Sequence, residues 1–145
     1  MNIDRLSTSA RITGAAALIG ALTAFLGWYS YTSGGTTTVT VNAFRASLFG
    51  DVYFLGTSAL VLMIAAEAGL LALPGRFTAL ATRQAAALVA GAAVILQILL
   101  SLDSGQSLHK GIGIAVLCAA GMVAGTRMDR APRRVIRAAH GIDLE

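Results

Sequence analysis

The sequence predicts an all-α integral membrane protein, an antiparallel bundle of four transmembrane helices with both termini in the cytoplasm. Four apolar stretches are each long enough to cross a hydrocarbon core of about 30 Å as a helix. Hydrophobic residues make up 56% of the chain and charged residues only 12%, whereas a soluble domain has about 25% charged residues. The cations are also distributed very unevenly between alternate connections.

The four predicted spans cover most of the chain and leave no room for a separate soluble domain. The spans are expected over residues 12–31, 52–73, 84–102 and 108–125. We divide the chain into a transmembrane domain over residues 1–127 and a basic cytoplasmic tail over residues 128–145.

The placement of the cations predicts the orientation. One set of helix ends carries nine of them, and the other set has only Arg45 and Lys110. The nine are Arg5, Arg11, Arg76, Arg83, Arg127, Arg130, Arg133, Arg134 and Arg137. Because positive residues stay on the cytoplasmic side, we expect a multi-pass protein of the plasma (inner) membrane. The Arg-, Ala- and Gly-rich composition is typical of a bacterial, high-GC genome, and the flanking arginines account for the net charge of +4 without nucleic acid.

The first span has two interpretations. Arg5 and Arg11 followed by an apolar core resemble a signal peptide, but no small-x-small cleavage site follows. We expect a retained helix, with Trp28 and Tyr29 in an interfacial aromatic belt. The next residues, 28–41, are rich in aromatic and β-branched side chains around a Ser-Gly-Gly segment, a pattern typical of a short β-hairpin in the first outer loop. An extended mobile loop is the alternative.

The later connections are shorter. Pro74 and Gly75 are expected to end the second helix at the inner face, and residues 103–107 form a tight outer turn. Beyond the fourth span, the tail is either a basic amphipathic helix on the membrane or a disordered topological signal. In the first case Arg133, Arg134 and Arg137 contact anionic lipids of the inner leaflet.

Small residues at four-residue spacing indicate close helix packing, because helices in lipid associate by close contact rather than by hydrophobic expulsion. Each predicted span has such a pair, and we expect the packing glycines to be Gly20, Gly69, Gly91, Gly121 and Gly125.

Few polar residues lie inside the spans. Glu67 is the only ionisable one, expected about 9 Å from the inner end of the second helix. It is either a cation- or proton-binding carboxylate or the partner of Arg76 or Arg83. Gln97 and Ser101 share a helix face and could line a polar path with Thr57, or could serve as interhelical hydrogen bonds.

A second polar group is expected at the outer surface, where four side chains fall at helix ends. They are Asp51, Asp103, His109 and Lys110. Asp51 could cap the second helix, and Asp103 could pair with Lys110 or His109 across the turn. Such a group could form a site, a pH switch or a partner contact, although structural pairing at helix ends is the more common arrangement.

No enzymatic motif is present, so we predict a protein without catalytic activity or a bound cofactor or metal. The leading hypothesis is an accessory or scaffold subunit that packs against other membrane-protein subunits or against itself. The rival is a homo-oligomeric ion channel or small transporter, with a path lined by Glu67, Gln97, Ser101 and Thr57. A weaker alternative is a lipid-binding membrane protein with a groove between helices.

Overall fold

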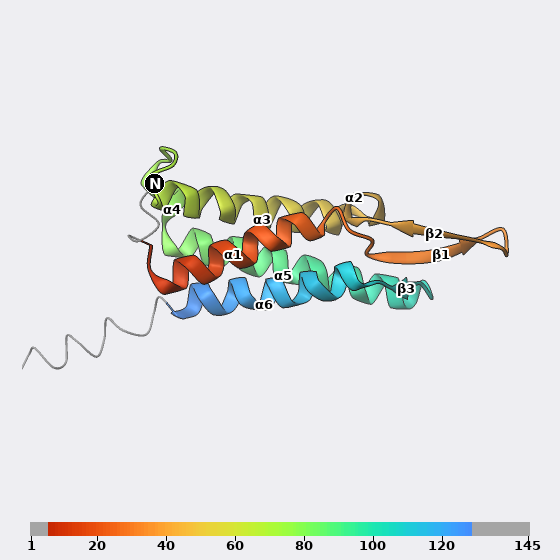
Figure 1. The fold of residues 1–145 in the computed structure, drawn as a ribbon. Helices are drawn as coiled ribbons and strands as arrows, with labels where there is room; N and C mark the ends of the chain where they lie inside the picture. Colours follow the sequence, from red (N-terminus) through yellow and green to blue (C-terminus); the bar gives the residue numbers. More distant parts are fainter. Residues whose placement is uncertain (1–5, 129–145) are drawn as a thin grey trace, which may run out of the picture.

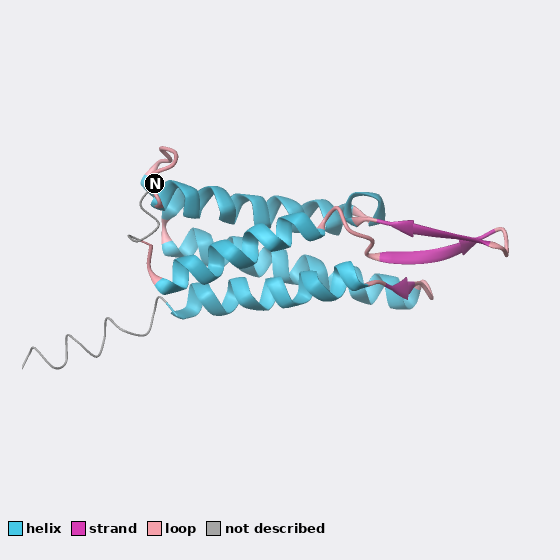
Figure 2. Ribbon diagram, in the orientation of Figure 1, coloured by secondary structure: helices cyan, strands magenta, loops and turns pink. Residues whose placement is uncertain are grey.

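The computed structural model describes residues 6–128 and is mostly helical. Its four long helices lie side by side, and a small sheet extends beyond one end of them (Figures 1 and 2). The long helices are α1 (Thr8–Thr23), α3 (Leu48–Glu67), α5 (Leu80–Asp103) and α6 (Lys110–Met128). Two short helices, α2 (Ala43–Ala46) and α4 (Gly75–Thr78), lie in the connections. The predicted lipid contacts at Arg133, Arg134 and Arg137 lie outside the described residues.

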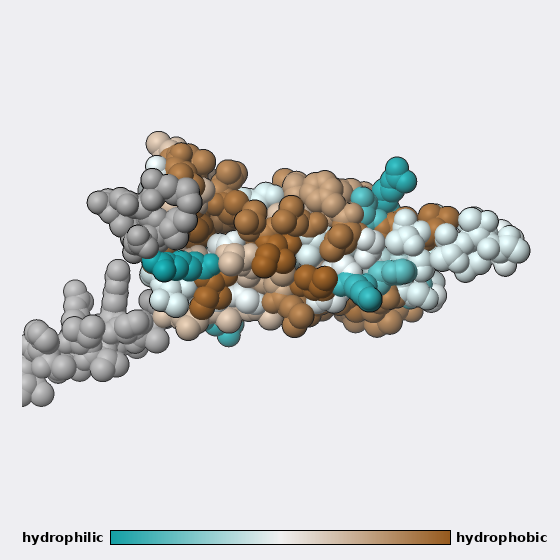
Figure 3. Space-filling view, in the orientation of Figure 1, coloured by the Kyte–Doolittle hydropathy of each residue, from teal (hydrophilic) through white to brown (hydrophobic). Residues whose placement is uncertain are grey.

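Three of the helices, α3, α5 and α6, are long and apolar enough to cross a membrane. Their outward side chains are apolar as well: Leu55 is 65% exposed and Leu117 is 73% exposed. Apolar side chains cover much of the middle of the helical part in Figure 3. A large exposed apolar surface is costly in water, so these helices indicate a membrane protein.

Helix α1 is shorter than the first predicted span, which was expected to reach residue 31. It ends at Thr23 after 16 residues, and the chain enters a strand at Tyr29. The backbone at Trp28 is committed to the sheet: its N–H donates to the Val41 carbonyl at 2.8 Å, and its own carbonyl accepts from the His109 N–H at 2.8 Å. A backbone paired in this way cannot continue an α-helix.

Helix α3 is shifted toward the N-terminus relative to the predicted span 52–73. It begins at Leu48 because Ser47 caps it, accepting a hydrogen bond from the Phe49 N–H. It ends at Glu67 in a Schellman motif, in which Leu70 N–H donates to Ala65 O at 2.9 Å. Gly69, at φ +77°, supplies the left-handed residue of this motif. The helix therefore stops well before Pro74.

The other two spans are close to the prediction. Helix α5 contains all of residues 84–102, and α6 begins at Lys110 because Leu108 belongs to a strand. The tight turn predicted over residues 103–107 is present, with Gly105 at φ +65°.

The predicted hairpin is present and belongs to a three-stranded antiparallel sheet of order β2-β1-β3. The strands are β1 (Tyr29–Ser33), β2 (Thr37–Val41) and β3 (Ser107–Leu108). Gly34 and Gly35 make the turn with φ of +65° and +80°, which glycine adopts without strain. Strand β3 was not predicted. It pairs only with Tyr29 and Ser30, so the rest of β1 has β2 alone as a neighbour.

The helices pack in a ring in which α1 contacts α3 and α6, and α5 contacts the same two helices. Small residues make this closeness possible. A Cβ at Gly125 would meet the Thr13 side-chain hydroxyl and lie 3.1 Å from the Thr13 backbone nitrogen. One at Gly121 would lie 3.2 Å from the Ala16 Cβ, and one at Gly20 would lie 2.8 Å from the Tyr53 hydroxyl.

Two of the predicted packing glycines have other environments. Gly69 lies outside the helix, has open space around it and serves as the helix terminator, so its assignment to a packing face is wrong. Gly91 packs loosely, since a Cβ there would meet only the Ala119 Cβ at 4.0 Å. The close contact between α3 and α5 is instead at Gly56, where an added Cβ would lie 3.1 Å from the Ala90 Cβ.

Candidate functional site

The sheet lies at one end of the bundle, called here the hairpin end, and Trp28 joins it to the helices. Trp28 is fully buried, and its indole N–H donates to the Thr23 carbonyl at 2.7 Å. Its ring meets the Tyr53 ring edge-on, with the centroids 5.2 Å apart. Trp28 is therefore part of the core and does not belong to a lipid-facing aromatic belt. One side chain thus contacts the end of α1, the base of the hairpin and α3.

The polar side chains at the base of the sheet are connected to one another. Ser47 donates to the Gln97 side-chain oxygen, and the Gln97 amide donates to the Ser101 hydroxyl at 3.3 Å. Tyr29 also forms a hydrogen bond with the Gln97 side chain. Burial raises the pKa of the Tyr29 hydroxyl and that hydrogen bond lowers it by less, so the group stays protonated at neutral pH. The network joins β1, the start of α3 and α5, which favours the packing interpretation of Gln97 and Ser101.

The hairpin base is held by backbone contacts as well. Ala43 N–H donates to the Ala24 carbonyl at 3.1 Å, and Gly111 N–H donates to the Gly27 carbonyl at 3.2 Å. An added Cβ at Gly50 would run into the Ala43 carbonyl, so α2 lies directly on the first turn of α3. These contacts hold the base of the sheet in a single position on the helix ends.

Beyond this base the hairpin is exposed. Tyr31, Thr32 and Ser33 are exposed on β1, and Thr37 and Thr38 are exposed on β2. The hairpin extends past the ends of the helices, away from the bundle (Figure 2). Within the described part of the chain, strand β2 has no neighbour on its outer side, so it is an edge strand there.

No family model, curated protein or solved structure matches this chain.

The predicted polar group at the hairpin end does not converge as expected. His109 pairs with the Ser30 hydroxyl at 3.0 Å through its Nε2 atom. Within residues 6–128, no ion pair joins Asp103 to Lys110 or His109. Asp51 lies in the first turn of α3, but the cap is Ser47, four residues earlier. Of the four side chains, His109 is the one with a hydrogen bond in the described part of the chain, and that bond leads to β1. The turn after α5 enters β3 instead of leading directly into the next helix.

An aromatic cluster lies beside the hairpin base and was not anticipated from the sequence. The Phe44 ring centroid is 5.2 Å from that of Phe25 and 5.0 Å from that of Phe54. Phe25 is 62% exposed and Phe44 is 37% exposed. These rings, rather than Trp28, are the aromatic side chains exposed beside the hairpin.

The start of α1, the α4 connection and the end of α6 lie together at the opposite end of the bundle (Figure 1). These segments and the first turn of α5 carry Arg11, Arg76, Arg127 and Arg83. We call this the arginine end. Glu67 is the last residue of α3 rather than a residue inside it, because the helix stops at the Schellman motif. Its carboxylate accepts from the Arg83 guanidinium at 2.6 Å, which is the ion-pair interpretation of Glu67. Arg83 also donates twice to the Thr78 carbonyl, which holds the α4 connection against the helix ends.

The four residues proposed to line a polar path are far from continuous. Glu67 lies at the arginine end, whereas Gln97 and Ser101 lie beneath the hairpin. Thr57 donates to the carbonyls of Tyr53 and Phe54 in its own helix. Every buried side-chain nitrogen or oxygen in the described part of the chain has a partner. The polar groups thus form structural contacts at the two ends of the helices and do not make a continuous path between them.

Proposed function

We propose that this protein is a non-catalytic accessory subunit that presents the hairpin to a partner outside the membrane. The observation that carries this proposal is a hairpin with a firmly held base and an exposed end. An isolated hairpin is marginally stable in water. Here contacts with Trp28 and Gln97 stabilise its base, and a simple connecting loop would not need such contacts. Rigid presentation of a binding element lowers the entropy cost of association.

The proposed orientation places all four long helices across the plasma membrane, with both termini in the cytoplasm. The arginine end carries Arg11, Arg76, Arg83 and Arg127, which is the distribution of cytoplasmic helix ends. Helix α1 is short, about 24 Å by its rise, but its outward side chains Leu18, Ile19 and Leu22 are each at least half exposed and apolar. These apolar side chains support α1 as the fourth span, and the arginine distribution supports a hairpin outside the cell.

The chemistry of the hairpin favours a protein partner. Its exposed end has hydroxyl side chains and no charge, and β2 offers unpaired backbone donors and acceptors along its outer side. Such an edge binds an extended segment of another chain by adding a strand. Phe25 and Phe44 beside the base extend this face with apolar contact area.

The first test is native mass spectrometry of the tagged protein extracted gently from its own membrane. We expect a stoichiometric complex with at least one other subunit. A photo-crosslinking residue at Thr38 should capture that subunit, whereas the same probe at the exposed apolar position Leu117 should not. Thr38→Lys should lower partner recovery, about tenfold for each 1.4 kcal/mol of lost contact. Arg45→Ala, on the exposed side of α2, is the matched control.

A defined homo-oligomer without other subunits would overturn the accessory role and favour the channel hypothesis. Ion flux in proteoliposomes would then be compared between the native protein and Glu67→Ala.

A further inference from the structure

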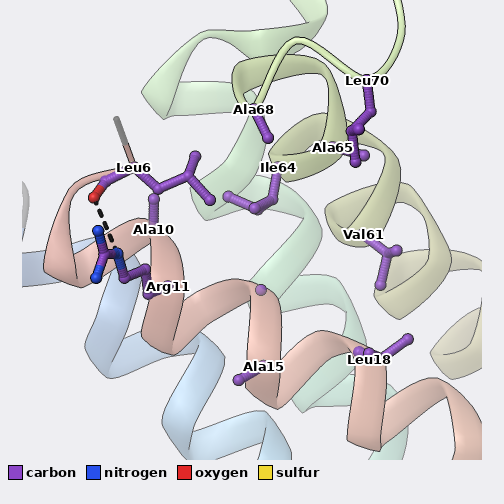
Figure 4. Close-up of a pocket in the computed structure, with 11 residues that line it drawn as sticks. Leu6, Ala10, Arg11, Ala15, Leu18, Val61, Ile64, Ala65, Ala68 and Leu70 are labelled. Carbon is purple, nitrogen blue, oxygen red and sulfur yellow. Dashed lines mark hydrogen bonds between the residues drawn. The ribbon is translucent and has the colours of Figure 1, made fainter. Parts of the chain in front are cut away.

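A groove of about 350 Å³ lies between α1 and α3 near the arginine end. The lining includes Ala10 and Ala15 on the α1 side and Val61, Ile64 and Ala65 on the α3 side (Figure 4). At its floor the helices are in close contact, since a Cβ at Gly14 would lie 3.0 Å from the Ile64 Cγ2. The groove exists because the side chains that line α1 here are too small to fill the space between the two helices.

The lining of this groove is apolar except at one point. Among the residues that the structure describes, Arg11 is the only charged one that lines it. The Arg11 Nε atom donates to the Leu6 carbonyl at 3.2 Å, which holds the guanidinium group beside Leu6, another residue of the lining (Figure 4). A cation at the rim of an apolar groove matches a ligand with an apolar body and an anionic head.

The surrounding charge has the same sign. Arg76, Arg83 and Arg127 lie at the same end of the bundle as Arg11, and the carboxylate described there, Glu67, is already paired with Arg83. The residues described at this end therefore carry a net positive charge, which attracts anions. A second groove of about 250 Å³, between α5 and α6, is lined by Gly91, Val94, Val116 and other apolar residues but by no cation, so it provides a comparison within the same chain.

We propose that the groove between α1 and α3 binds one acyl chain of an anionic phospholipid, whose phosphate contacts Arg11. A hydrocarbon chain has no polar atoms to satisfy and so fits the apolar lining, and the phosphate accepts hydrogen bonds from a guanidinium in a favourable geometry. The proposal rests on the placement of α1 in the membrane given above and is independent of the hairpin's partner. A failure of the lipid proposal would therefore leave the accessory role untouched, and the reverse also holds.

The experiment is native mass spectrometry of the full chain after reconstitution in bilayers of equal parts phosphatidylglycerol and phosphatidylcholine. The native protein should retain one phosphatidylglycerol in preference to phosphatidylcholine. Arg11→Gln should reduce that preference about fivefold, the contribution expected of one arginine near anionic lipid. Ala15→Phe, which fills the groove from an exposed position, should abolish retention.

Two matched variants are the controls. Arg76→Gln removes a cation at the same end but outside the groove, and Ala120→Phe fills the cation-free groove between α5 and α6. Both should retain phosphatidylglycerol as the native protein does. Equal retention of the two lipids by the native protein would overturn the proposal, and so would a loss in Arg76→Gln as large as that in Arg11→Gln.

A lipid-free dimer that Ala15→Phe converts to monomer would also overturn the proposal, because a second copy would then fill the groove. If Ala15→Phe fails to fold, the comparison of Arg11→Gln with Arg76→Gln decides the question alone.

Discussion

Gly125 and Gly113 lie on the same helix, but only one of them has a neighbour. An added Cβ at Gly125 would meet the Thr13 hydroxyl and lie 3.2 Å from the Ser9 carbonyl oxygen, whereas one at Gly113 would meet nothing within 4 Å. Two neighbours of the added Gly125 Cβ, the Thr13 nitrogen and the Ser9 carbonyl oxygen, are backbone atoms of α1, so relieving the overlap requires the whole helix to shift. Gly125 therefore sets the distance between α1 and α6, and Gly113 does not.

We expect Gly125→Ala to destabilise the protein by about 1–3 kcal/mol through overpacking. Gly113→Ala should be neutral or stabilising by up to about 1 kcal/mol, because alanine is the better helix former. Thermal unfolding of both variants in the same detergent checks this pair. Equal stability of the two would contradict the close contact of α1 with α6.

The ion pair of Glu67 with Arg83 should contribute little to stability. The Glu67 side chain is 32% exposed, so water screens the attraction between the two charges. Water also solvates each charge well when the pair is broken. Glu67→Gln should cost less than about 1 kcal/mol, with a smaller effect at high salt, measured as the shift of the unfolding midpoint at two ionic strengths. A loss of several kcal/mol would mean that the carboxylate is buried in lipid after all.

At the scale of elements, the sheet depends on contacts from helices that are far apart in the sequence. Trp28 uses its backbone to pair with Val41 and His109 and its ring to contact Tyr53. The residues of β1 and β2 favour strands, but the hairpin is stabilised by its contacts with the helix ends beneath it. Loss of this attachment should release the hairpin before the bundle unfolds.

Trp28→Phe tests this attachment, because it keeps an aromatic ring but removes the indole donor to the Thr23 carbonyl. We expect a loss of about 1 kcal/mol from the missing hydrogen bond, because the Thr23 carbonyl still accepts from the Leu26 N–H at 3.1 Å. Hydrogen exchange in β1 and β2 should become faster, with little change in the middle of α5. Tyr31→Phe, at an exposed position of the same strand, should leave exchange unchanged. Uniform acceleration in strands and helices alike would show that the sheet and bundle open together.

At the scale of the whole molecule, the two ends of the bundle should face opposite sides of the membrane. In a Cys118→Ala background, Thr37→Cys in the hairpin should react with a membrane-impermeant maleimide added to intact cells. Arg76→Cys at the arginine end should react only after permeabilisation. The reverse pattern would place the hairpin in the cytoplasm, and reaction of both positions in intact cells would contradict the spanning arrangement.

Much of this architecture follows from the sequence because its causes are local. Hydrophobic length identifies α5 and α6, and the β-branched run flanking Gly34 and Gly35 identifies the hairpin. The end of α3 was missed, although its signal was local too: Gly69 is a better helix terminator than Pro74, because it offers the left-handed conformation that caps the last turn. The ion pair of Glu67 with Arg83 was among the alternatives that the spacing allowed.

What the sequence determined by itself is the membrane class, the long helices and the hairpin, since each depends on composition over a short window. The tertiary structure decided which polar and aromatic residues meet. Burial of Trp28, the link from Ser47 to Gln97 and the β3 strand each join segments distant in the chain. Such contacts depend on how the helices pack, and no local pattern encodes them. The same holds for the groove beside Arg11, which lies between α1 and α3 and has their contact at Gly14 as its floor.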